Sequence, residues 1–375
     1  MISYITHKSF PIFLFIILSP YYVLPSGLPQ PSHIVFIIGF VFSSFIAPKV
    51  YIDKLSKQVL LFFFLFILYT FIVNSISVGV SNILNPIIYS FYYVFGLMMM
   101  LYIFKNKDKD RLSLYLIYAV VISMSIELLL ILLFGIGNWG GVRFSGTFNN
   151  PNQLGYFAIL SSSIGIISAF YLNKSFKYMN IILILGILLS ILSGSRTAVV
   201  AILFLYLAVS YYKLQRVHFY MTLFFIILII YVLFIVYGSE IEMISMLLDR
   251  LEEKTTAKHD LGADIMHRGL GRIPDYGIYI FSGMSEGIQY LGYDIEAHNS
   301  ILAMLYGYGV IGLLFIFVYM FMLLIKRTQN FVLGIIPALL YGMGHNGMRA
   351  TLLYLLIAIS IVLYKKDKKV NNYAR

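Results

Sequence analysis

The sequence predicts an all-α polytopic membrane protein with about 12 transmembrane helices and one long outer loop. Its 375 residues are 60% hydrophobic and 11% charged, with a mean hydropathy of +0.88. A soluble domain of this size does not need so much apolar surface, so we assign the excess to lipid contact. The apolar residues form runs that are long enough to cross a bilayer, and the basic residues alternate between the connections of these runs. This alternation follows the positive-inside rule.

Each predicted span is a mostly apolar run near the length of about 20 residues that a membrane helix needs. The first run, Phe10 to Leu24, has no small-residue cleavage site, so we expect a first span rather than a signal peptide. The predicted spans cover approximately residues 9–24, 33–48, 58–73, 83–104, 112–136, 153–172, 178–193, 197–212, 217–237, 298–325, 330–345 and 348–364.

The basic residues determine the predicted orientation. With the N-terminus inside, nineteen of the 27 lysines and arginines lie in inner connections and tails. Both termini are therefore expected in the cytoplasm, and the net charge of +11 needs no nucleic-acid partner. The chain then divides into a transmembrane bundle (1–237), a long outer loop (238–297), and a C-terminal part (298–375) with three spans and a basic tail.

Several chemistries are excluded or disfavoured by the sequence. The absence of cysteine excludes disulfides, thiolate metal sites and cysteine nucleophiles. No P-loop, dinucleotide fingerprint or His-Glu-x-x-His helix is present. The pair Asp108 and Asp110 falls in a connection of alternating charges, which favours a solvated loop over a metal site. We therefore expect no metal and no cofactor.

Arg196 is the single charged residue in the apolar stretch 188–207. An arginine near the bilayer core costs roughly 2.5–3.5 kcal/mol on insertion scales. One helix over 179–212 would be about 51 Å long, too long for a hydrocarbon core of about 30 Å. We therefore predict two helices joined at residues 193–196, with the turn near the outer surface. Arg196 then either reaches lipid headgroups or binds an anion at a helix start.

Other polar residues fall on the same predicted outer face. The segment 140–157 fits either a turn capped at Asn150 or a site that binds a hydroxyl-rich ligand. Glu127, inside the fifth span, is expected either to pair with an outer-face arginine or to face a wet cavity, and the sequence favours pairing. In the long loop, the apolar spacing from Ile241 to Leu251 predicts an amphipathic helix, and 267–287 is expected to fold back onto the bundle. His298, where a span begins, fits a structural or a catalytic role.

Three segments together resemble the bacterial O-antigen ligase and O-antigen polymerase superfamily. They are Arg143–Phe148 followed by Asn150-Pro151-Asn152, the turn Ser193-Gly194-Ser195-Arg196-Thr197, and His298-Asn299 followed by Gly309–Gly312. The long outer loop before His298 is also similar to that of the family. The resemblance covers roughly residues 140 to 325.

The resemblance implies a GT-C-like glycosyltransferase in the bacterial inner membrane, with its active site facing the periplasm. Its donor is a glycan on undecaprenyl diphosphate, and its acceptor is a glycan hydroxyl. The family also implies the lipid bilayer and a chain-length regulator as partners. The catalytic residues it implies are His298, Arg196 and Arg272, with Arg268 as the alternative to Arg272 and Tyr276 as the aromatic that follows. The substrate-binding candidates are Arg143, Arg268, Asn152, Asn299 and Arg349.

Physical chemistry is consistent with these roles. Arginine binds phosphate with two parallel hydrogen bonds and keeps its charge in a poorly hydrated site. Fixed cations aimed at the leaving diphosphate stabilise the charge that develops there. Histidine can accept the proton of the acceptor hydroxyl, because its pKa lies near the working pH. We therefore expect direct, inverting and metal-independent transfer.

Three functions remain open from the sequence. A polymerase extends one lipid-linked glycan with another, and the modest chain, without an extended acceptor-handling domain, favours it. A ligase transfers the finished glycan to lipid A-core. A polysaccharide transporter or flippase also has about twelve spans, but the sequence shows no convincing internal repeat.

Overall fold

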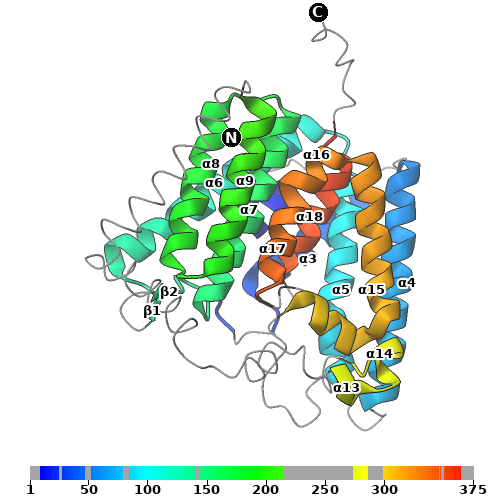
Figure 1. The fold of residues 1–375 in the computed structure, drawn as a ribbon. Helices are drawn as coiled ribbons and strands as arrows, with labels where there is room; N and C mark the ends of the chain where they lie inside the picture. Colours follow the sequence, from blue (N-terminus) through cyan, green and yellow to red (C-terminus); the bar gives the residue numbers. More distant parts are fainter. Residues whose placement is uncertain are drawn as a thin grey trace, which may run out of the picture.

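The computed structural model describes residues 9–24, 28–46, 52–78, 84–139, 143–214, 273–285, 299–345, 347 and 350–364. This part of the chain is a helical bundle with one short hairpin (Figure 1). Its elements are α2 (Phe10–Leu18), α3 (Pro31–Ile46), α4 (Lys54–Val78), α5 (Leu84–Phe104), α6 (Lys109–Phe134), β1 (Asn138–Trp139), β2 (Arg143–Phe144), α7 (Pro151–Tyr171), α8 (Phe176–Leu192), α9 (Arg196–Lys213), α13 (Ile273–Tyr276), α14 (Tyr279–Ser282), α15 (Ser300–Lys326), α16 (Thr328–Asn330), η3 (Phe331–Ile335), α17 (Ile336–Gly342) and α18 (Thr351–Val362).

The predicted all-α fold is confirmed for these residues. Every predicted span within the described residues contains a helix, although α2 covers only part of 9–24 and the span 330–345 is divided among α16, η3 and α17. The predicted span 217–237 and the predicted amphipathic helix of 241–251 lie outside the described residues. Within the described residues, five helices are long and apolar enough to cross a membrane, which is the pattern of a multi-pass membrane protein. These five are Lys54–Ile76, Lys109–Phe134, Pro151–Tyr171, Arg196–Lys213 and Ser300–Lys326. The total of twelve spans stays a prediction.

Helix α7 lies at the centre of the bundle. Almost all of its residues are buried, and it contacts α6, α8, α9, α17 and α18. Small residues make this close packing possible: Gly155 lies against Ser193, and Gly165 lies against Ile182. In Figure 1, α6 to α9 form one group, α4, α5 and α15 form another, and α17 and α18 lie between them.

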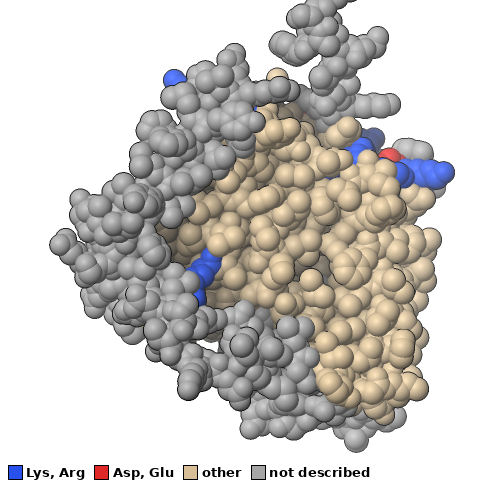
Figure 2. Space-filling model, in the orientation of Figure 1, with Lys and Arg blue, Asp and Glu red and all other residues tan. Residues whose placement is uncertain are grey.

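The outer surface of α4 is apolar. Leu61, Phe64, Leu68, Phe71 and Ile72 are all exposed on it. Figure 2 shows the same property on a wider scale: uncharged side chains cover the middle of the face, and charged ones gather mainly near its upper edge. A broad uncharged belt of this kind is the surface that a lipid bilayer covers.

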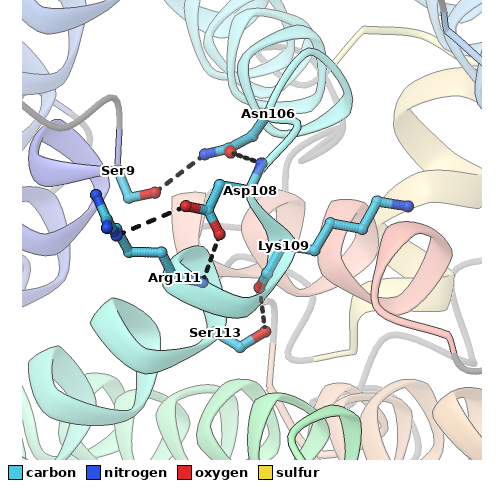
Figure 3. A network of polar contacts seen from close by, with 6 residues as sticks. All are labelled: Ser9, Asn106, Asp108, Lys109, Arg111 and Ser113. Atoms are coloured by element: carbon cyan, nitrogen blue, oxygen red, sulfur yellow. Dashed lines mark hydrogen bonds and ion pairs between the residues drawn. The ribbon is translucent and has the colours of Figure 1, made fainter.

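The two ends of the bundle differ. In Figure 1, α16 lies at one end, and β1, β2, α13 and α14 lie at the other, which we call the outer end because the sequence predicts that it faces outward. At the opposite end, Asp108 caps α6 by accepting a hydrogen bond of 3.0 Å from the backbone N–H of Arg111 (Figure 3). Nearby, Asn106 donates to the Ser9 hydroxyl at 3.0 Å and so ties α5 to α2. Asp108 is therefore a helix cap.

Helix α15 is broken at Gly309, whereas the sequence predicts one continuous span over 298–325. The φ angle of Gly309 is +66°, a conformation that favours glycine. The carbonyls of Tyr306 and Gly307, released by the break, accept 2.9 Å hydrogen bonds from the backbone N–H groups of Met284 and Ser285. Residues 300–308 consequently turn away from the rest of α15 at the outer end (Figure 1).

The segment 273–285 folds back onto the bundle, as the sequence predicts for 267–287. Tyr276 is fully buried and stacks on Tyr306, with ring centroids 4.3 Å apart. The Tyr69 hydroxyl of α4 lies 2.6 Å from the Ser282 carbonyl and 3.0 Å from that of Tyr308. The outer segment is thus attached to both α15 and α4.

Candidate functional site

The strand β2 delivers Arg143 to the outer end, and a buried carboxylate holds the loop that follows it. Oε1 of Glu127 accepts a 2.6 Å hydrogen bond from the backbone N–H of Thr147, and Oε2 lies 2.8 Å from the Thr147 hydroxyl. Gly146 has φ +59°, and a Cβ there would collide with the Glu127 carboxylate. The expected pairing of Glu127 with an outer-face arginine is wrong, because the carboxylate is committed to the backbone and side chain of Thr147.

Arg143 joins two of the sequence motifs. Its Nε donates to the Ser193 carbonyl at 3.1 Å, and its Nη2 donates to Oδ1 of Asn152 at 3.1 Å. Its aliphatic stem packs on Gly194, where an added Cβ would lie 2.8 Å from Cγ of Arg143. The guanidinium therefore lies between the α8–α9 turn and the first turn of α7.

The α8–α9 turn has the predicted form. Helices of 17 and 18 residues end and begin around Ser193, Gly194 and Ser195, and Gly194 has φ +59°. Arg196 is the first residue of α9 and is partly exposed, so it lies at a helix start, the end of a helix that favours an anion. The Ser195 and Thr197 hydroxyls are 3.1 Å apart on the same turn.

The first turn of α7 supports both interpretations of its sequence. Asn150 caps the helix by accepting a 3.0 Å hydrogen bond from the backbone N–H of Gln153, and Pro151 occupies the first helical position. Asn152, one residue further, contacts Arg143. The structural role therefore belongs to Asn150, and Asn152 is the amide that lies in the candidate site.

Three aromatic residues that the sequence did not single out complete the site. Tyr156 and Tyr341 stack with ring centroids 4.5 Å apart and an interplanar angle of 11°. The His345 ring lies beside Tyr341, and the centroids of these two rings are 5.0 Å apart. The Tyr341 hydroxyl donates to the Asn152 carbonyl and also interacts with Ser195. We call Arg143, Asn152, Ser195, Tyr341 and His345 the polar cluster.

His345 lies in a short turn after α17 that we call the α17 turn (residues 343–345 and 347). Hydrogen bonds of 2.9 Å tie it to the start of α15: Asn299 donates to the Met343 carbonyl, and Ser300 both donates to the His345 carbonyl and accepts from the Gly347 N–H. Oδ1 of Asn299 also caps α15. Of the motif His298-Asn299, Asn299 therefore connects to the site, because its side-chain amide binds the backbone of the α17 turn and of α15.

An apolar cavity of about 110 Å³ opens beside the polar cluster. Its walls come mostly from α4, α15, α17 and α18, through residues such as Phe63, Phe315 and Leu339. Tyr156, Ser300 and Gly342 also line it. A single ligand with a polar head and an apolar chain could therefore contact the cluster and the cavity at once.

Four of the predicted site residues, His298, Arg268, Arg272 and Arg349, lie outside the described residues. Of the others, Arg143 and Asn152 touch each other, Arg196 follows Ser195 of the polar cluster, and Asn299 binds the α17 turn. Tyr276, the aromatic after Arg272, packs in the interior against Tyr306. Among the described residues, no group of three His, Asp or Glu side chains could hold a metal ion.

The polar cluster can bind an anion. It joins a guanidinium with fixed hydrogen-bond partners to a helix start that bears a second arginine. Its histidine could have been suspected from the sequence, because His345 lies at the outer end of the apolar span predicted over 330–345. No protein-family model matches this chain, and a search of curated proteins finds no match.

Proposed function

We propose that this protein is a membrane glycosyltransferase of the O-antigen polymerase kind. It would transfer a glycan from undecaprenyl diphosphate to a hydroxyl of another lipid-linked repeat unit. The observation that carries the proposal is the contact of Arg143 with Ser193 and Asn152, which unites two motifs about fifty residues apart in sequence beside Arg196. An arginine at a helix start, with a second guanidinium beside the turn that precedes that helix, suits a diphosphate.

The position of the apolar cavity supports a lipid-linked donor. A lipid diphosphate has a strongly anionic head and an apolar chain, and the protein has an arginine-bearing cluster beside an apolar cavity. Tyr156 connects the two, since it stacks on Tyr341 of the cluster and lines the cavity. The diphosphate would bind at the cluster while the first part of the chain enters the cavity.

In this proposal the reaction is a direct displacement. The acceptor oxygen forms a bond to the anomeric carbon, the bond from that carbon to the phosphate oxygen breaks, and the lipid diphosphate leaves with the electron pair. Arg196 and Arg143 stabilise the charge that develops on the phosphate. His298, assigned by resemblance, accepts the proton of the acceptor hydroxyl. The roles of Arg272, Arg268 and Arg349 stay predictions.

A genetic experiment tests the proposal. The gene is deleted in its host, and the lipopolysaccharide ladder is examined after complementation with wild type, Arg143→Ala, Arg196→Ala and His298→Ala. Arg111→Ala is the matched control, because Arg111 is exposed at the opposite end of the bundle. A polymerase is supported by core with a single repeat in the deletion strain, restored by wild type and Arg111→Ala but not by the site variants.

Other outcomes separate the alternatives. Loss of every repeat from the core, with accumulation of lipid-linked polymer, identifies the ligase instead. An unchanged ladder removes both functions for this glycan. The break in α15 is the observation that favours a transporter, because transporters commonly use discontinuous helices. Accumulation of single lipid-linked repeats on the cytoplasmic side of the membrane would support that function.

A further inference from the structure

His345 and His33 are the histidines that the structure describes, and they differ in their surroundings. His33 is buried: its Nδ1 accepts a 2.8 Å hydrogen bond from the Gln30 N–H, and its Nε2 lies 3.1 Å from the Thr351 hydroxyl. His345 is partly exposed at the outer end. His33 is therefore a structural residue, whereas His345 is placed where a ligand of the polar cluster could reach it.

His345 is held by contacts to both its backbone and its ring. Its backbone is tied to Ser300, and its ring lies against Tyr341, which is buried and stacks on Tyr156. The neighbouring glycines are tightly packed, since a Cβ on Gly344 would collide with Thr197 and one on Gly347 with Tyr156. The backbone that carries the imidazole is therefore held in place before a ligand binds, which reduces the cost of ordering it on binding.

The charged groups around His345 are mostly positive. Among the side chains that the structure describes at this end, Arg143 comes from β2 and Arg196 from α9, while Glu127 of α6 is occupied by Thr147. The other facing groups are neutral: the phenols of Tyr156 and Tyr341 from α7 and α17, and Asn299 and Ser300 from α15. Arg143 acts electrostatically on Tyr341, whose ring the His345 ring contacts, and Arg196 is the neighbour of Thr197, which packs against Gly344. Cations placed in this way disfavour protonation of the imidazole, and a bound polyanion reverses that effect.

We propose that His345 is a third cationic ligand of the diphosphate site, neutral when the site is empty and protonated when a diphosphate is bound. Diphosphate binding then takes up a proton at the imidazole. The proposal rests on the proposed function in its choice of ligand. His345, which is distinct from the predicted base His298, would then bind the leaving diphosphate.

The test measures binding rather than turnover. Full-length protein in nanodiscs of zwitterionic lipid is titrated with inorganic pyrophosphate by calorimetry, from about pH 6 to about pH 8 in buffers of different ionisation enthalpy. Zwitterionic lipid is used so that no anionic headgroup competes for the arginines. Because pyrophosphate itself titrates in this range, proton uptake is read as the difference between wild type and each variant.

The expected results differ between two variants. His345→Gln binds about tenfold more weakly at the acid end and takes up fewer protons than wild type. His345→Lys keeps a cation, so it binds tightly across the whole range and also loses the extra proton uptake. A merely structural role for His345 would not produce this recovery of alkaline binding by lysine.

Each contrary outcome has a definite meaning. If His345→Gln matches wild type in affinity and proton uptake while Arg143→Ala and Arg196→Ala lose binding, the role of His345 is wrong and the diphosphate site survives. If the arginine variants also bind normally, or wild type binds no pyrophosphate, the proposed function fails as well. If lysine binds no better than glutamine at pH 8, the cationic role is overturned.

Discussion

The Glu127 carboxylate and the Thr147 backbone N–H, twenty residues apart in sequence, are joined by a 2.6 Å hydrogen bond. Glu127 comes from the last third of a long apolar helix, and Thr147 belongs to the loop that follows Arg143. A buried acid therefore fixes the loop that carries an arginine of the candidate site, without itself contacting that arginine.

Glu127→Ala should destabilise the protein by about 1–3 kcal/mol, because it leaves the partly buried Thr147 N–H without its acceptor. The measurement is the Tm of purified protein, together with complementation of the deletion strain. Thr147→Ser keeps both the N–H and the hydroxyl, and its Tm should stay near that of wild type. Equal Tm values for Glu127→Ala and wild type would show that the hydrogen bond does not hold the loop.

Gly146→Ala should be more damaging than a glycine substitution elsewhere with the same backbone conformation. At Gly146 the new Cβ meets the Glu127 carboxylate, so a loss of about 2–4 kcal/mol is expected. Gly135 has a similar φ, +61°, but nothing lies within 4 Å of its added Cβ. Gly135→Ala should therefore cost about 1 kcal/mol. Thermal unfolding of both variants compares them directly, and equal losses would contradict the collision.

Gly309→Ala should disrupt the break in α15. Its φ of +66° is strained for any other residue, and a Cβ would collide with the Phe281 carbonyl. We expect a loss of at least about 1–3 kcal/mol and impaired complementation. Gly277→Ala is the control, because Gly277 also has a positive φ but nothing within 4 Å of its added Cβ. A Gly309→Ala protein as stable as the control would mean that the break is not required.

Arg143→Lys tests whether charge alone is enough at this position. Lysine keeps the charge but cannot reproduce the planar geometry that contacts the Ser193 carbonyl and Asn152 together. Complementation by Arg143→Lys should be reduced about tenfold or more in long-chain product, with normal protein level. Full activity of the lysine variant would show that the guanidinium geometry is unimportant.

The sequence predicted the helices, turns and caps better than the contacts between residues that are distant in the chain. Apolar runs located the helices, because lipid contact imposes a minimum length on each. The turn at Ser193–Arg196 followed from a length argument, and the cap at Asn150 followed from local chemistry. These features depend on neighbours in sequence, so no knowledge of the fold was needed.

The features that were missed depend on distant contacts. The break at Gly309 is stabilised by Met284 and Ser285, which donate to the carbonyls that it releases. Glu127 accepts hydrogen bonds from Thr147 in a loop instead of from an arginine. His345 reaches the candidate site because α17 packs against α7 and α9. Hydropathy and motif spacing carry no information on such long-range pairings.

The broken helix has a mechanical consequence. Residues 300–308 form a short rod of about 13 Å. At one end its carbonyls accept hydrogen bonds from Met284 and Ser285. At the other end Asn299 and Ser300 form hydrogen bonds to the turn that bears His345. A helix is stiff along its axis, so a displacement of the residues bonded at one end is transmitted to the residues bonded at the other end. Because α15 breaks at Gly309, the outer segment 279–285 and the turn that bears His345 are mechanically coupled through one short helix.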